Sequence, residues 1–300
     1  MKAVQLQAFG DVDQFKLADV ADPVAGAGQV VIRVAASGLN PVDLYARQGY
    51  LQQYYPMTLP AVLGIDAAGT ITAVGPGVTG FSVGDKVIAH LPIDGKGAHA
   101  ELAPVPVAGL AKLPAGVSFE QGATLPLVGL TARQSVDALE VKAGDRVLVS
   151  GALGAVGRAA VQYLKELGAV PVAGVRAARL AEGKALAGEA VDIDQPPASP
   201  SFSKAVSTAG PVAGKVFGFV KDGGTIASAV QTPEGANPGE RVKVAQIMGH
   251  DDPAMLQKIA DAAGRGELKL PVAQTFKLGQ LGEAHKALAA NPPGKVIVTH

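Results

Sequence analysis

Cysteine and tryptophan do not occur in this chain of 300 residues, and aromatic residues make up only 4% of it. Without cysteine, the protein has no disulfide, no thiol nucleophile and no thiolate ligand for a metal ion. A net charge is missing as well, because 26 basic side chains balance 26 acidic ones with histidine neutral. We therefore expect no attraction to nucleic acid, and small molecules as the partners.

Long hydrophobic runs are also lacking. Uncharged stretches such as residues 48–65 and 67–84 are interrupted by glycine, threonine and proline, so none has the composition of a membrane-spanning helix. The first residues are not followed by the apolar segment of a signal peptide. These observations favour a soluble, cytoplasmic protein without a membrane partner.

Hydrophobic residues in total are plentiful, at 48% of the chain, which suffices for two domain cores. Short β-like segments such as residues 29–34 and 69–74 dominate the first 120 residues, separated by glycine-rich turns. Strands and helices then alternate, which is typical of a parallel sheet. Residues 294–299 again resemble a strand, and we expect them to pair with the first domain.

The most informative motif is Ser-Gly-Ala-Leu-Gly-Ala-Val-Gly at residues 150–157, here called the glycine turn. An apolar strand precedes it, and apolar residues at helical spacing follow it as far as Gly168. This order is typical of a dinucleotide-binding unit, in which backbone N–H groups and the helix N-terminus bind a pyrophosphate. A structural glycine loop is the alternative. The predicted cofactor contacts are Ser150, Gly151, Ala152, Leu153, Gly154, Ala155, Val156 and Gly157.

The end of the second strand, residues 170–175, is where such a fold distinguishes NAD from NADP. An acidic residue there would bind the free ribose 2′-hydroxyl of NAD. Arg176 and Arg179 follow instead, with no carboxylate before Glu182. Two guanidinium groups suit a 2′-phosphate, so we predict NADPH as the cofactor. The alternative is that these arginines only begin a solvated helix.

Besides the glycine turn, five segments of the chain are distinctive: Ser-Gly-Leu-Asn-Pro-Val-Asp at 37–43, Leu-Gly-Ile-Asp-Ala-Ala-Gly at 63–69, Gly-Pro-Gly-Val at 75–78, Val-Gly-Asp-Lys-Val at 83–87 and Gly-Leu-Thr-Ala at 129–132. With these segments the chain resembles, along its whole length, one family, the medium-chain dehydrogenases and reductases, and within it the zinc-free quinone oxidoreductase branch. The resemblance implies an α/β fold, with a GroES-like β-barrel catalytic domain and a Rossmann-type, doubly wound parallel sheet for the cofactor.

From this resemblance we expect the catalytic domain to comprise residues 1–120 and 267–300, and the NADP-binding domain residues 121–266. The active cleft is then expected between the two domains. Relatives often form homodimers through an edge strand, which would correspond here to residues 241–248, so a homodimer is implied as well.

Zinc-dependent relatives carry a cysteine and a histidine as metal ligands at the positions of Asn40 and Ile65. Neither ligand is present, and the five histidines show no ligand spacing, so we expect no metal. Without a Lewis acid, hydride addition to an electrophilic acceptor is easier than alcohol oxidation. The implied reaction is zinc-independent hydride transfer from NADPH to a quinone or to a conjugated carbonyl, an enone or alkenal.

By the same resemblance, Asn40, Tyr45 and Thr131 line the nicotinamide end of the cleft, while Tyr50 contacts the substrate. Asn40, Tyr45 and Tyr50 are therefore the catalytic candidates, and Thr131 is counted among the cofactor contacts. Three further residues are expected to approach the cofactor from the next strand end: Thr208, Ala209 and Gly210.

Several nearby residues are open to a different interpretation. Tyr54 and Tyr55 are additional substrate candidates, but an aromatic packing loop is the alternative for the whole tyrosine cluster at residues 45–55. Asp43 resembles a catalytic acid, yet a carboxylate beside a turn readily caps backbone N–H groups. We interpret Asp43 and Asp66 as structural, and His99 as a packed histidine.

The cofactor domain departs from its family between the strand-like residues 190–194 and 203–207. Eight residues separate these segments, three of them proline, whereas a parallel crossover needs about a dozen residues or more. We expect a missing crossover helix, a proline-rich loop and thin cover on one sheet face. Two functions stay open: the NADPH-dependent reductase, including an enoyl-thioester reductase, and an NADPH-binding sensor or interaction protein with little catalysis.

Overall fold

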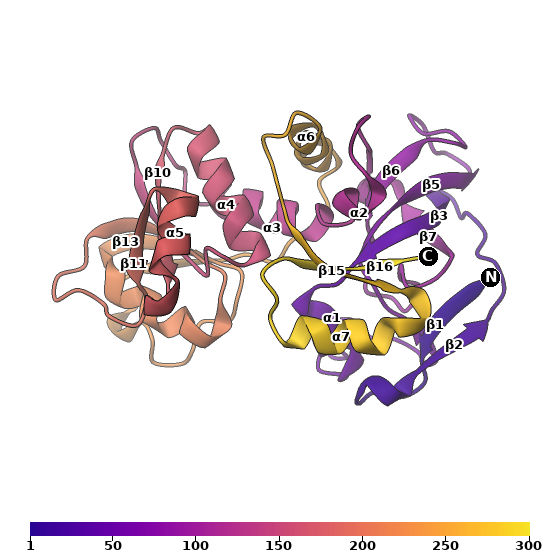
Figure 1. Ribbon diagram of the computed structural model, residues 1–300, viewed down its shortest axis with the longest axis horizontal. Helices are drawn as coiled ribbons and strands as arrows, with labels where there is room; N and C mark the ends of the chain where they lie inside the picture. The colour runs from indigo at the N-terminus through magenta and orange to yellow at the C-terminus, as the bar shows by residue number, and fades with distance from the viewer. The chain divides into compact units, whose positions relative to one another are not determined.

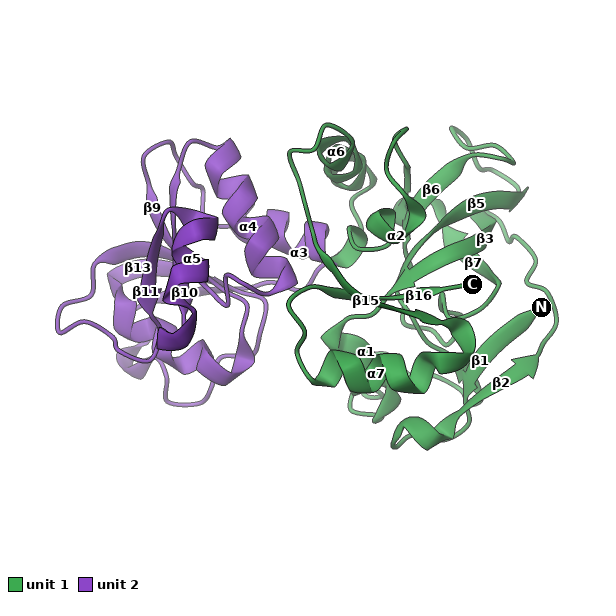
Figure 2. Cartoon of the chain, viewed as in Figure 1, with its two compact units in different colours: residues 1–127, 251–300 green, residues 128–250 purple.

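The computed structural model describes residues 1–300, which form two compact units (Figure 1). Unit 1 comprises residues 1–127 and 251–300, and unit 2 comprises residues 128–250 (Figure 2). The sequence predicted that the first segment of unit 1 ends at residue 120 and that the second begins at residue 267, whereas the structure has 127 and 251. The second segment begins earlier because helix α6 (Pro253–Gly264) packs against strand β8 (Leu110–Lys112) of unit 1. No helix of the chain combines the length and apolar character needed to cross a bilayer.

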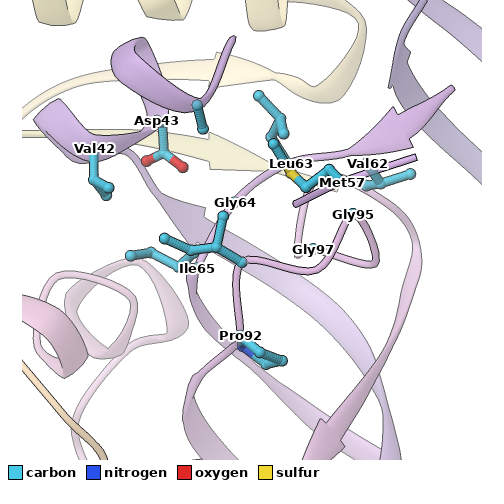
Figure 3. A pocket seen from close by; sticks show the side chains of 12 residues that line it. Val42, Asp43, Met57, Val62, Leu63, Gly64, Ile65, Pro92, Gly95 and Gly97 are labelled. Carbon is cyan, nitrogen blue, oxygen red and sulfur yellow. The ribbon is translucent and has the colours of Figure 1, made fainter. Parts of the chain in front are cut away.

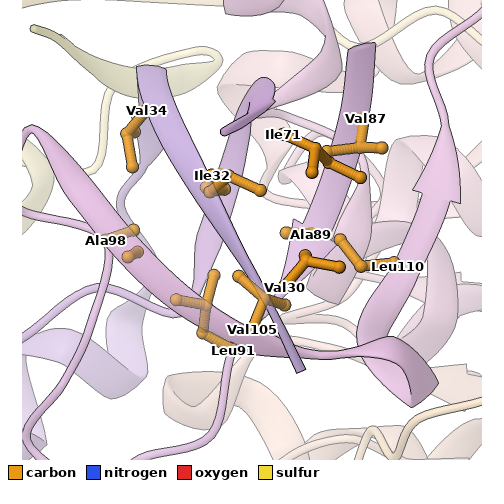
Figure 4. Close-up of a cluster of buried hydrophobic side chains, with 12 residues drawn as sticks. Val30, Ile32, Val34, Ile71, Val87, Ala89, Leu91, Ala98, Val105 and Leu110 are labelled. Carbon is orange, nitrogen blue, oxygen red and sulfur yellow. The ribbon is translucent and has the colours of Figure 1, made fainter. Parts of the chain in front are cut away.

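Unit 1 is built around a seven-stranded sheet in the order β15-β16-β3-β5-β6-β8, with β7 also paired to β3. All pairings are antiparallel except that of β15 with β16. The remaining strand bounds are β3 (Gln29–Gly38), β5 (Asp66–Val74), β6 (Lys86–His90), β7 (Leu102–Pro106), β15 (Val272–Lys277) and β16 (Lys295–Thr299). Alternate residues of β3 point inward, and Val30, Ile32 and Val34 meet Ile71 and Val87 in the core (Figure 4). The expected GroES-like, barrel-like half is confirmed.

A smaller antiparallel sheet, β2-β1-β4, completes unit 1 together with short helices. These elements are β1 (Lys2–Leu6), η1 (Val12–Gln14), β2 (Phe15–Asp19), α1 (Pro41–Arg47), β4 (Ala61–Val62), η2 (Val107–Gly109), α2 (Phe119–Gly122), η6 (Leu278–Gln280) and α7 (Leu281–Ala289). The late strand β16 pairs with β3, opposing Ile297 to Gly38. The expected return of the chain to the first domain is therefore confirmed, and it brings residues near 295 beside those near 40.

Unit 2 contains a six-stranded, wholly parallel sheet in the order β11-β10-β9-β12-β13-β14. Its elements are α3 (Pro126–Asp137, beginning in unit 1), β9 (Arg146–Ser150), α4 (Ala155–Glu166), β10 (Val170–Val175), η3 (Ala177–Arg179), α5 (Leu180–Ala187), β11 (Glu189–Asp192), β12 (Phe202–Ser207), η4 (Gly210–Phe219), β13 (Val220–Ser228), η5 (Pro238–Glu240) and β14 (Lys243–Gln246). Strands β9 and β12 are neighbours at the centre of the sheet. From β9 the chain continues to β10 and β11 on one side, and from β12 to β13 and β14 on the other. Such a switch point is where doubly wound sheets bind ligands, and the predicted Rossmann-type fold is confirmed.

The segment between β11 and β12 contains no helix, as its prolines predict. The expected thin cover of the sheet, however, is wrong. Leu148, Val172 and Ile226 on that face are completely buried, because the long 3₁₀ helix η4 contributes Val216 and Phe217 to the same core. The proline loop also lies against η4, and a Cβ at Gly218 would be only 2.7 Å from Pro196.

Candidate functional site

The glycine turn joins the end of β9 to the start of α4. Each of its three glycines occupies its position for a different structural reason. Gly151 has φ of +72°, and a Cβ there would lie 2.7 Å from Thr208 Oγ1. At Gly157 a Cβ would lie 2.2 Å from the Gly151 carbonyl oxygen, so no other residue allows this close packing. Gly154, the N-cap of α4, is exposed, and its nearest neighbour to a Cβ is that same oxygen at 3.3 Å. The turn thus presents open backbone at the N-terminus of α4.

A row of serine hydroxyls crosses the carboxyl end of the sheet beside this turn. Ser150, Ser207 and Ser228 are register partners on β9, β12 and β13. The Ser228 hydroxyl donates to the Val230 carbonyl, but the buried hydroxyls of Ser150 and Ser207 have no partner. An unpaired buried hydroxyl is costly unless something else satisfies it. Two such groups beside an open helix N-terminus fit a dinucleotide that supplies polar atoms to them.

Of the segment expected to approach the cofactor, residues 208–210, the structure places Thr208 and Ala209 against Gly151 of the glycine turn. Thr208 Oγ1 donates to the Ser150 carbonyl at 2.7 Å. Gly210 begins η4, and its Cβ position is open. Thr131, in contrast, is buried on α3, where its carbonyl accepts a hydrogen bond from Ser135. These four residues all belong to unit 2.

The two arginines after β10 differ in their surroundings. Arg176 is exposed and forms no ion pair, whereas Arg179 pairs with Glu182 through both of its carboxylate oxygens, at 2.9 and 2.7 Å. The Arg179 guanidinium holds the pKa of Glu182 below its usual value. Arg158, in the first turn of α4, is a candidate that the sequence analysis did not identify. Its Nε donates a hydrogen bond to the Leu153 carbonyl at 3.0 Å. A cation directly after the last glycine of the turn was the signal that could have found it.

Unit 1 holds a buried polar cluster formed by Asn40, Asp66 and Lys295. Asn40 Nδ2 donates to Asp66 Oδ2 at 2.8 Å, and Lys295 Nζ donates to Asn40 Oδ1 at 2.6 Å. Lys295 Nζ also lies 3.4 Å from Asp66 Oδ2. The other oxygen of Asp66 accepts from the Leu127 backbone at 2.9 Å. Burial lowers the pKa of Lys295, and the nearby Asp66 opposes that shift.

This cluster leaves the predicted catalytic residue Asn40 without a free polar group. Its side chain is buried, its amide and carbonyl are both engaged, and its backbone forms the N-cap of α1. Asn40 therefore fixes the start of α1. This position, where the resemblance implies a metal-ligating cysteine in zinc-dependent relatives, thus has a structural role here.

Zinc does not fit the residues present. No group of three histidine, cysteine or acidic side chains could hold a metal ion in this chain. At the positions of the metal ligands stand Asn40 and the apolar Ile65, and the Lys295 ammonium already lies against the Asn40 and Asp66 oxygens. A second cation beside that ammonium would be repelled.

Asp43 completes the capping box of α1, because its Oδ2 accepts from the Asn40 backbone N–H at 2.7 Å. Burial, with the nearby Asp66 charge, raises the pKa of Asp43 to about 7. The carboxyl also lines a small pocket whose walls include Met57, Leu63 and Ile65 (Figure 3). Its free volume of about 10 Å³ holds about one water molecule. The interpretation of Asp43 as a capping residue agrees with these contacts.

The tyrosine cluster is exposed. Tyr45, on α1, and Tyr50, Tyr54 and Tyr55, in the turns that follow, have exposed fractions between 37% and 65%. A packing loop would have buried these rings, so that alternative is wrong. Their hydroxyls and ring faces remain available on the surface of unit 1.

The histidines of unit 1 that lie deepest are packing residues. His99 bonds to the Ser37 hydroxyl at 3.1 Å through Nδ1, and its ring packs 6.3 Å from that of His285. Burial holds the pKa of His99 well below its usual value and lowers that of His285 to about 3. The interpretation of His99 as packed agrees with this environment.

Two family models match parts of this chain. Residues 26–115 match the family model described as alcohol dehydrogenase GroES-like domain, and residues 167–298 match the one described as zinc-binding dehydrogenase. A human quinone oxidoreductase is 40% identical over 170 residues, which cover 56% of this chain and 50% of that protein. In such alignments the chain spans about half the length of the curated relatives.

Two solved structures match over the entire chain. The quinone oxidoreductase of Pseudomonas syringae pv. Tomato DC3000 is 30% identical with a TM-score of 0.86, and 100% of this chain aligns with 99% of that one. An NAD-dependent alcohol dehydrogenase is also 30% identical, with a TM-score of 0.87 and 100% of both chains covered.

Proposed function

Because the chain belongs to the medium-chain dehydrogenase/reductase superfamily and groups there with the quinone oxidoreductases, we propose that it is an NADPH-dependent, zinc-independent reductase of quinones or conjugated carbonyls. The family implies a nicotinamide cofactor. The observation that carries the proposal is the glycine turn beside two buried, unpartnered serine hydroxyls, since both features are explained by one bound dinucleotide.

In this proposal unit 2 binds the cofactor through its own backbone. The N–H groups at the start of α4 bind the pyrophosphate, because four backbone donors at a helix N-terminus have no partner within the helix. Ser150 and Ser207 gain hydrogen-bond partners, and cationic side chains after β10 bind the 2′-phosphate. NADPH, when bound, supplies the hydride.

Unit 1 contributes the substrate contacts. Tyr45 and Tyr50 are exposed, so their hydroxyls can donate to the oxygen of a quinone or enone and stabilise the charge that develops there. Hydride adds to the β-carbon of an enone, or to a quinone, and a proton from a hydroxyl or water completes the reduction. Asn40 acts at a distance, by fixing the start of α1 and thereby the position of Tyr45.

The first test is NADPH oxidation by chelator-treated protein with 2-alkenals, cyclic enones and benzoquinones, and with NADH as the comparison. Turnover that survives metal removal supports a zinc-independent reductase and ranks its acceptors. Binding of NADPH without oxidation of any acceptor would contradict the proposal in favour of a sensor or interaction protein.

A matched pair of variants sharpens this test. Gly154→Val places a side chain over the exposed backbone of the turn, where its Cβ meets one protein atom, the Gly151 carbonyl oxygen at 3.3 Å, so it should block the cofactor with only a small shift of the turn. Gly214→Ala, on η4, serves as the control, because its Cβ makes only ordinary contacts, with Pro233 at 3.6 Å and Ala236 at 3.7 Å. Equal activity of the two variants would contradict cofactor binding at the glycine turn.

A further inference from the structure

The arginines of unit 2 fall into two groups. Four contact carboxylates: Arg133 with Asp137 and Glu166, Arg146 with Glu189, Arg179 with Glu182, and Arg241 with Asp222. Arg158 and Arg176 form no ion pair. Both belong to the carboxyl side of the parallel sheet, one after the glycine turn and the other after β10. The uncompensated guanidinium charge of unit 2 is thus confined to the end of the sheet that carries the glycine turn.

Arg158 is held in a defined orientation. Its Nε donates to the Leu153 carbonyl within the glycine turn at 3.0 Å, and the side chain is half-buried. This bond leaves the two terminal Nη groups without a carboxylate partner. Arg158 lies on α4, which contacts both β10 and α5. The helix that carries this guanidinium therefore neighbours the strand after which Arg176 follows.

We propose that Arg158, with Arg176, is the specificity-determining residue that recognises a 2′-phosphate on the adenosine ribose, while Arg179 is reserved by Glu182. This inference rests on the proposed cofactor site and revises which cations serve it. A nucleotide with a phosphomonoester at the 2′ position is the ligand class. A guanidinium presents paired N–H donors that match phosphate oxygens.

Arg158 and Arg179 differ in two ways: whether a carboxylate already binds the guanidinium, and how firmly the side chain is held. Arg179 is neutralised by a bidentate partner, so a phosphate that approached it would have to displace Glu182 or lie against its carboxylate. Arg158 has no such competitor, and its bond to Leu153 reduces the freedom lost when the phosphate binds. Glu182, for its part, is occupied by Arg179 and is not free to accept a ribose hydroxyl.

The test measures equilibrium binding of NADP⁺ and NAD⁺ by calorimetry, since these ligands differ only by the 2′-phosphate. Arg158→Gln removes the charge but keeps an N–H donor for the turn. It should weaken NADP⁺ about tenfold to a hundredfold, the worth of a hydrogen bond to a charged group, and leave NAD⁺ nearly unchanged. Arg158→Lys, which keeps the charge, should retain part of the preference. The loss caused by Arg158→Gln should grow as the salt concentration falls, because the charge that it removes is then less screened.

Arg146→Gln is the matched control, because Arg146 is an ion-paired arginine at the opposite end of β9. It should leave both affinities unchanged. Equal weakening of NADP⁺ and NAD⁺ by Arg158→Gln would overturn the inference and assign Arg158 a purely structural role in the turn. Wild-type protein that binds NADP⁺ and NAD⁺ with equal affinity would also overturn the inference about Arg158, but would leave the proposed dinucleotide site standing. Protein that binds neither would overturn the proposed function itself.

Discussion

A buried polar cluster in unit 1 and a pair of buried serines in unit 2 differ in whether the protein itself satisfies them. In unit 1, Asn40, Asp66 and Lys295 satisfy one another within the protein, and a metal has no vacant ligand set there. In unit 2, Ser150 and Ser207 are equally buried but have no partner. A satisfied cluster contributes to the fold, whereas an unpaired buried hydroxyl costs stability unless a ligand or a water supplies a partner. We therefore assign the cluster of unit 1 to the fold and propose the two serines for binding.

The largest effect is expected when the cluster of unit 1 loses its cation. Lys295→Met leaves the Asp66 carboxylate buried without an ammonium, which should lower the free energy of unfolding by about 3–5 kcal/mol. Urea denaturation measures this loss. Adding Asp66→Asn to Lys295→Met should recover part of it, and a double variant as unstable as the single one would show that the pair is not coupled.

The pKa of Asp43 predicts how the stability of unit 1 depends on pH. The pKa of Asp43 is raised to about 7 in the folded protein, against about 3.9 in an unfolded chain. Between these values the folded state binds more protons, so raising the pH from 4 to 7 removes stability, at most about 4 kcal/mol. Asp66 and Lys295 are the charged groups that act on it.

Asp43→Asn should abolish this part of the pH dependence while keeping an acceptor for the Asn40 backbone. The informative quantity is the difference between variant and wild-type unfolding free energies at pH 5 and pH 8. A difference that does not change with pH would show that Asp43 is already ionised at pH 5 in the folded state.

His285 should act in the opposite direction. Its pKa is lowered to about 3 in the folded protein, against about 6.5 unfolded, so its contribution is complete above pH 6.5 and is lost as the pH falls. The loss is about 1.4 kcal/mol per pH unit, or about 2 kcal/mol between pH 6 and pH 4.5. His285→Leu should flatten this acid limb in thermal melts, and an acid limb as steep as that of the wild type would show that another group carries it.

The smallest effect, and the sharpest contrast, is expected in unit 2. Ser150→Ala and Ser207→Ala each remove an unpartnered hydroxyl, so the free protein should be as stable as the wild type or slightly more stable. Dinucleotide affinity should nevertheless fall by about 1 kcal/mol for each hydroxyl. Ser228→Ala is the control, since that hydroxyl already bonds to Val230. A loss of stability without a loss of affinity would place both serines with the satisfied groups.

Much of the fold was predictable because its signals are local. The glycine turn, the strands on either side of it and the proline-rich loop all appear where sequence placed them, since turn geometry and periodicity depend on neighbours in the chain. The pairing of Arg179 with Glu182 was also within reach, as residues three apart on a helical turn commonly pair.

The cluster of unit 1 was not predictable in this way. Lys295 lies 255 residues from Asn40, and only the pairing of β16 with β3 brings them together. The cover of the parallel sheet was misjudged because η4, a 3₁₀ helix of ten residues, is longer than such helices usually are. Long-range register and unusual helices leave little trace in a single sequence.

The pairing of β16 with β3 also dictates an order of events during synthesis. Unit 2 is contiguous, so all of it leaves the ribosome before residues 251–300 do. Unit 1 must wait, with the first 127 residues lacking two strands of their sheet and the Asp66 carboxylate lacking its ammonium. The nascent chain therefore carries a complete unit 2 attached to an incomplete unit 1, and the incomplete unit is the part that chaperones and proteases can bind during synthesis.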